Sequence, residues 1–146
     1  MVVLSMCLSD RSRNKEMQRV VWLFLGACLS LVVACSKPKP EEVAVGTAKL
    51  YYEHLLAGRY DDFLAGTYRE DSIPDEYHSQ LVDNAKMFLA LQQSRHKGIR
   101  KIEQGGGTYD EKSHTANVFL MFSYGDGTTE QVLVPMIEKN EVWYLR

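Results

Sequence analysis

The sequence has 146 residues, about the length of one ordinary domain, and 45% of them are hydrophobic while 25% are charged. This hydrophobic content excludes a disordered chain, and the formal charge of −2 argues against a nucleic-acid-binding protein. Three cysteines are too few for a disulfide-rich scaffold. These averages hide an asymmetry, because the first 35 residues differ in pattern from all that follow.

The amino-terminal segment has the pattern of an export signal. Its basic residues are Arg11, Arg13, Lys15 and Arg19, and an uncharged, mainly apolar run follows at 20–34. That run has 15 residues, whereas a membrane-spanning helix needs about 20. A basic flank, a short apolar stretch and a small final residue are typical of a secretory signal peptide. We therefore expect residues 1–34 to be a signal peptide, with an uncleaved anchor helix as the alternative.

The apolar run ends in Val32-Val33-Ala34-Cys35. This motif resembles the lipobox of bacterial lipoproteins, in which the cysteine receives a diacylglyceryl group and the chain is cut before it. The resemblance implies that Cys35 is lipidated and that the membrane is a partner through this lipid. It places the protein in the bacterial cell envelope, with the outer membrane favoured over the inner. Met17 is an alternative start of the precursor, because a compact signal would begin there.

Removal of the signal makes the remaining chain more acidic. The part after Cys35 retains 13 lysines and arginines against 17 aspartates and glutamates, a net charge of −4. This charge further disfavours a nucleic-acid partner. With Cys35 lipidated, no free cysteine remains as a nucleophile or a metal ligand.

Residues 35–41 are expected to form the lipidated cysteine and a short tether, because two closely spaced prolines favour an extended chain. A single domain is expected at 42–146, beginning with helices. The first helix starts near Pro40 and ends near Gly58, and a short second helix covers 60–65. The expected apolar stripe of the first helix is Val43, Thr47, Tyr51 and Leu55, with Ala44, Ala48 and Tyr52 beside it.

A longer third helix is expected at about 74–97 and ends at Gly98. Its helical periodicity predicts a buried stripe made of Tyr77, Leu81, Ala85, Phe88 and Leu91 or Gln92. The alternative helical faces carry mainly charged and polar side chains.

Beyond Gly98 the hydrophobic period changes to two, which predicts strands. The expected strands are 99–104, 115–124, 129–138 and 142–145. Three glycines at 105–107 either bend or end the first strand, and apolar residues on both faces of 115–124 indicate a central strand. Pro135 predicts an edge or a bulge in the third strand, and a turn is expected at 139–140. Helices followed by antiparallel strands predict an α+β fold.

This order resembles the cone-shaped fold of the nuclear transport factor two superfamily, also called cystatin-like. It is closer still to small bacterial lipoproteins of unknown function built on that fold. The resemblance lies in Tyr51-Tyr52, in residues 58–63, in Tyr124-Gly125-Asp126-Gly127 and in residues 139–145. It implies amino-terminal helices packed on a curved antiparallel sheet of about four strands, with a pocket inside the cone. It implies no particular activity, because this fold carries enzymes and binding proteins alike.

The resemblance also indicates which residues would surround that pocket. Those expected to line it are Tyr52, His54, Tyr68, Phe88, Phe122 and Trp143. His54 could serve as an acid or base, and Asp61 or Asp62 with Tyr52 could imitate the site of ketosteroid isomerases of the same fold. The alternative is that the aromatic side chains simply fill the cone. No metal site or cofactor is predicted, because no histidine pair has ligand spacing on one helix.

The sequence is compatible with three functions. The first is a non-enzymatic, lipid-anchored envelope protein that binds a small apolar ligand or another envelope protein. The second is a small isomerase-like or cyclase-like enzyme that uses a pocket inside the cone. The third is an accessory structural lipoprotein of envelope assembly.

Overall fold

The structure is a computed structural model that describes residues 37–146, so the predicted signal peptide and the lipidation of Cys35 lie outside the described residues. Its helices are α2 (Pro40–Leu56), α3 (Tyr60–Ala65) and α4 (Asp75–His96). Its strands are β1 (Ile99–Asp110), β2 (Thr115–Tyr124), β3 (Thr129–Lys139) and β4 (Val142–Leu145). Among these described helices, none is long and apolar enough to cross a membrane.

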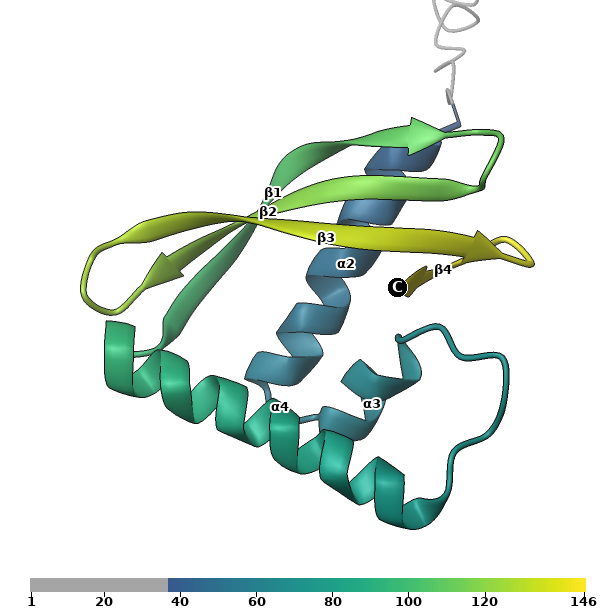
Figure 1. The fold of residues 1–146 in the computed structure, drawn as a ribbon. Coiled ribbons are helices and arrows are strands. Elements are labelled where there is room, and N and C mark those ends of the chain that lie inside the picture. The colour runs from purple at the N-terminus through teal and green to yellow at the C-terminus, as the bar shows by residue number, and fades with distance from the viewer. Residues whose placement is uncertain (1–36) are drawn as a thin grey trace, which may run out of the picture. The chain divides into compact units, whose positions relative to one another are not determined.

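The four strands form one antiparallel sheet in the order β1-β2-β3-β4. Figure 1 shows α2 lying across one face of this sheet and α4 running beyond the lower end of α2. Helix α2 contacts all four strands, whereas the main contacts of α4 are with α3 and β1. The chain therefore has the predicted α+β architecture, in which helices at the start of the domain pack on a curved antiparallel sheet.

The hydrophobic core lies between α2 and the sheet. Every second side chain of β2 is buried there, namely Ala116, Val118, Leu120, Phe122 and Tyr124. From α2 the core receives Ala44, Val45 and Ala48, whereas Val43 is 39% exposed. The apolar stripe predicted for this helix is thus rotated. The two alanines let the helix backbone approach the sheet closely, so the side that carries them faces inward.

Helix α4 packs less closely than its sequence pattern predicts. The structure matches the predicted bounds to within a residue at each end, and Lys97 adopts the left-handed conformation that ends the helix. Ala85 is the one buried residue of α4, while Tyr77 is 48% and Leu91 is 42% exposed. The prediction that these two residues are buried is wrong. Within residues 37–146, α4 packs mainly on α3 and β1, and the flank that carries these two residues is left exposed.

The glycines at 105–107 bend the first strand and do not end it. Strand β1 continues to Asp110, and its pairing with β2 shifts register between Gln104 and Gly106. A β-carbon on Gly105 would lie 3.0 Å from the main-chain oxygen of Phe119. The absence of a side chain therefore lets the bent strand approach β2 closely.

The segment that follows α3 is attached to the last strand. Thr67 forms an isolated parallel bridge with Leu145. The N–H of Leu145 donates to the carbonyl of Gly66 at 2.7 Å, and the N–H of Tyr68 donates to the carbonyl of Leu145 at 2.7 Å. A loop between two helices is thereby held beside β4, where it forms one side of a cavity.

Candidate functional site

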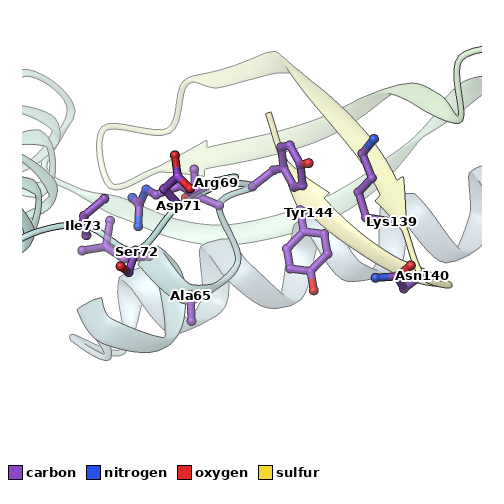
Figure 2. Close-up of a pocket in the computed structure, with 11 residues that line it drawn as sticks. Ala65, Arg69, Asp71, Ser72, Ile73, Lys139, Asn140 and Tyr144 are labelled. Atoms are coloured by element: carbon purple, nitrogen blue, oxygen red, sulfur yellow. The ribbon is translucent and has the colours of Figure 1, made fainter.

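The candidate site is a solvent-open cavity of about 360 Å³ between the loop after α3 and the β3–β4 turn. Figure 2 shows Arg69, Asp71, Ser72 and Ile73 on the loop side of this cavity and Lys139 and Asn140 at the turn, with Tyr144 between them. The other lining residues are Leu64, Ala65, Thr67 and Tyr68. We call this space the loop–turn cavity.

Two local structures hold the walls of the loop–turn cavity. On one side, the hydrogen bonds between 66–68 and Leu145 fix the start of the loop. On the other, Lys139 pairs with Val142, so that Asn140 and Glu141 form a two-residue turn. Both turn residues have positive φ, 51° and 64°, as a type I′ turn requires. The turn predicted at 139–140 is therefore present, shifted by one residue.

Aromatic rings form part of the cavity wall. The ring centroids of Tyr68 and Tyr144 lie 6.1 Å apart, in a tilted arrangement. The ammonium nitrogen of Lys139 lies 5.4 Å from the centroid of the Tyr68 ring, within the range of a cation–π interaction. The Lys139 side chain thereby lies over the Tyr68 ring in the wall of the cavity.

The loop–turn cavity carries more positive than negative charge. Arg69 and Lys139 supply two cations and Asp71 one carboxylate. Arg69 is half-buried, and neither it nor Lys139 belongs to any of the ion pairs found within residues 37–146. A cation that is partly removed from water and has no carboxylate partner favours the arrival of an anion.

The polar groups of this cavity are mainly hydrogen-bond donors. A guanidinium group has five N–H donors in a planar fork, and an ammonium group has three. The Asn140 amide and the hydroxyl groups of Thr67 and Ser72 can donate as well. Among the lining residues there is one carboxylate and neither histidine nor cysteine. This set of groups is suited to holding an oxyanion.

The structure places the residues predicted to line a pocket in different environments. Tyr68 lines the loop–turn cavity. Phe122 and Trp143 are 1% and 4% exposed in the core, and Phe88 packs against that core. The Tyr52 ring makes edge contacts with Phe63 and Phe122 at 5.6 and 5.4 Å, and burial raises the pKa of its hydroxyl. The structure therefore does not gather these residues around one cavity.

His54 lies at the end of α2 and is mostly buried. Its Nδ1 atom has no hydrogen-bond partner in the described part of the chain, although the Asp62 carboxylate lies 3.8 Å away. The Asp61 carboxylate lies 3.4 Å from His78, on another helix. No hydrogen bond within residues 37–146 joins Tyr52 to either aspartate, so the isomerase-like arrangement considered from the sequence is not assembled.

Sequence reasoning missed most of the cavity wall. Arg69 and Asp71 lie in a loop, and Lys139 and Asn140 lie at the end of β3 and in the turn after it, where hydrophobic periodicity does not mark a position as inward or outward. The loop comes next to the turn through the bridge between Thr67 and Leu145. That pairing joins residues far apart in the sequence, and no local signal predicts it.

Comparisons with known proteins add information on the fold. No protein-family model matches the sequence, and no curated protein matches it either. A solved structure from Campylobacter jejuni, described as a "Putative NTF2-like transpeptidase", superimposes with a TM-score of 0.55. The match covers 74% of this chain and 97% of that one, at 14% sequence identity. The chain has the NTF2-like fold.

NTF2 stands for nuclear transport factor two, the superfamily whose fold the sequence resembles. The fold expected from that resemblance is therefore confirmed. At 14% identity the likeness concerns the fold alone. Different NTF2-like domains have different functions, so the function of this one depends on its own residues.

Proposed function

We propose that this protein is a lipid-anchored protein of the bacterial cell envelope, in which the NTF2-like domain is a non-enzymatic binding module. The lipobox-like Val32-Val33-Ala34-Cys35 motif, after a basic and then an apolar segment, supports the anchor. Diacylglyceryl and amino-terminal acyl chains together hold a protein firmly, whereas one chain holds it only marginally.

The loop–turn cavity is the observation that supports a binding module. It is open to solvent, it has about 360 Å³ of space, and its walls come from two segments that the fold fixes together. This volume is at the lower end of the range typical of small-molecule sites. Its lining offers hydrogen-bond donors and aromatic surface, which are groups that recognise a ligand.

The anchor is tested by fractionating cells that express the full chain. The wild-type protein is expected in the membrane fraction, and Cys35→Ala is expected to be released or to remain as a longer, unprocessed precursor. Ser36→Ala is the matched control, because it alters the neighbouring residue and leaves the cysteine. A correctly shortened Cys35→Ala protein that stays in the membrane would overturn the lipid anchor.

The binding role is tested by mass spectrometry of ligands recovered from the purified full chain. Ligands are taken from an extract of the envelope, incubated with the protein and released by denaturation. Recovery of an unchanged mass that is enriched over a cavity-filled Ala65→Trp variant supports a binding module. Conversion of a bound compound to a new mass would instead establish the enzyme alternative.

A further inference from the structure

We infer that the loop–turn cavity binds a small molecule with one carboxylate group and an apolar or aromatic body. This inference rests on the proposed binding function and names its ligand class. It differs from the small apolar ligand or other envelope protein expected from the sequence, since the lining of this cavity includes charged and polar side chains.

The charge of the cavity selects an anion. Arg69 lines the cavity from the loop and Lys139 lines it from the turn, with Tyr144 between them, and Asp71 lies near Arg69 on the loop. The formal charges of these three lining residues sum to +1. One carboxylate would neutralise this charge, whereas a doubly charged phosphate group would leave an excess of negative charge beside Asp71.

The hydrogen-bonding groups match a carboxylate in particular. A guanidinium fork binds the two oxygens of a planar carboxylate through parallel N–H donors, and Arg69 is the half-buried cation of this cavity. The Lys139 ammonium adds a flexible donor whose position is biased by the Tyr68 ring. The Asn140 amide stands on the same side of the cavity as Lys139.

The remaining wall suits the rest of the ligand. The rings of Tyr68 and Tyr144, together with the side chains of Leu64 and Ile73, provide apolar surface next to the cations. A cavity of about 360 Å³ accepts a body of the size of an amino acid or a dipeptide. An acylated aromatic amino acid and the free carboxyl end of a short peptide share this chemistry.

The experiment compares two probes that differ in a single group. N-acetyl-L-tyrosine carries the carboxylate, and N-acetyl-L-tyrosinamide replaces it with an uncharged amide. Binding to the full chain, purified in a non-ionic detergent, is measured by calorimetry or by NMR. We expect the carboxylate to bind at least about tenfold more tightly than the amide, and its affinity to fall as salt is raised.

Variants connect that preference to the cavity. Arg69→Gln and Lys139→Gln are each expected to weaken binding of N-acetyl-L-tyrosine by about tenfold, while the amide probe is little affected. Arg95→Gln and Lys112→Gln are the matched controls, because these exposed cations do not line the loop–turn cavity and their loss is expected to leave both affinities unchanged. Arg69→Lys is expected to restore part of the affinity, since it keeps the charge and loses the planar fork.

The possible results test the carboxylate ligand and the general binding role separately. Equal affinity for the acid and the amide, or an Arg69→Gln variant that binds the acid normally, would overturn the carboxylate inference and leave a binding module in place. Failure of N-acetyl-L-tyrosine, of a free dipeptide and of benzoate to bind would also overturn it. In that case, the proposed binding role stands or falls on whether the envelope extract yields an enriched ligand.

Discussion

The aromatic ring of Tyr51 lies directly against the α-carbon of Gly66, in the space that a β-carbon on this residue would occupy. The same tyrosine donates a hydrogen bond of 3.0 Å from its hydroxyl to the main-chain carbonyl of Trp143. Tyr51 thus joins α2 to the end of α3 and to β4. Gly66 stands at the base of the loop that lines the loop–turn cavity, so this contact also helps to position that loop.

Gly66→Ala is therefore expected to destabilise the domain by about 1–3 kcal/mol, the usual cost of an added group in a packed interior. The φ of Gly66 is −74°, which any residue adopts, so the cost is purely steric. Denaturant unfolding measures it.

Gly46→Ala is the matched control for the previous change. A β-carbon at this position in α2 would meet the Gln104 side chain at an ordinary distance of 3.6 Å. Because alanine is a better helix former than glycine, we expect Gly46→Ala to stabilise the domain by about 0.5–1 kcal/mol. Changes of the same sign in both variants would contradict the packing described for Tyr51.

Glu141→Gly is expected to stabilise the domain. Glu141 is the second residue of the β3–β4 turn and has a φ of 64°, where a side chain is strained and glycine is not. Relief of that strain is worth about 1 kcal/mol, less the extra entropy that glycine brings to the unfolded chain. Thermal unfolding is expected to shift upward by a few degrees. Glu111→Gly, at another exposed turn, is the comparison, and an equal shift there would point to an effect of lost charge.

The turn between β2 and β3 gives a prediction about pH. Hydrogen bonds from the hydroxyl and the N–H of Thr128, followed by the nearby His96, lower the pKa of Asp126 to about 2, from an ordinary 3.8. A carboxyl group with a lower pKa in the folded state stabilises the protein above its unfolded pKa. That contribution is lost as the pH falls through the folded pKa.

Asp126→Asn is consequently expected to lower the melting temperature by a constant amount above about pH 5, and the difference from wild type is expected to shrink between pH 4 and pH 2. Asp83→Asn, at an exposed position on α4, is the control and is expected to give a small difference that varies little over this range. A gap between Asp126→Asn and wild type that widens in acid would show the opposite linkage.

His54→Leu tests whether the buried histidine is needed for the fold. Its Nδ1 atom has no hydrogen bond in the described part of the chain, so an apolar side chain of similar size leaves no partner unsatisfied there. We expect the free energy of unfolding to change by less than about 1 kcal/mol, or to rise. Leu55→Ala, in the adjacent and fully buried position, is expected to cost about 2–5 kcal/mol. A comparably large loss for His54→Leu would show that the imidazole makes an essential contact.

The sequence predicted the fold well where periodicity reports burial. The alternation of 115–124 identified the central strand and its inner face, and the two-residue spacing located β4 with its observed bounds. Helix faces were less accurate. The pattern predicted that Val43 and Tyr77 are buried, but both are exposed. Periodicity identifies the apolar side of a helix and does not predict how many other elements cover that side.

Hydrophobic periodicity did not predict the candidate site. Tyr68 was named as a pocket residue, but for a pocket inside the cone, where Phe122 and Trp143 instead form packed core. Arg69 and Lys139 line one cavity because a loop pairs in parallel with the last strand. Local sequence propensity does not predict such a pairing, because the pairing is stabilised by two main-chain hydrogen bonds between segments that are distant in the sequence.

The bridge between Thr67 and Leu145 also has a consequence for the order in which this domain is built. The hydrogen bonds of Gly66, Tyr68 and Tyr51 all involve residues of β4, which follows the other three strands of this sheet in the sequence. Long-range closures of this kind form late and slowly. A growing chain that has passed β3 therefore already has its helices and most of its sheet, yet lacks one wall of the loop–turn cavity. The wall of the loop–turn cavity is complete only when residues 142–145 have joined the sheet.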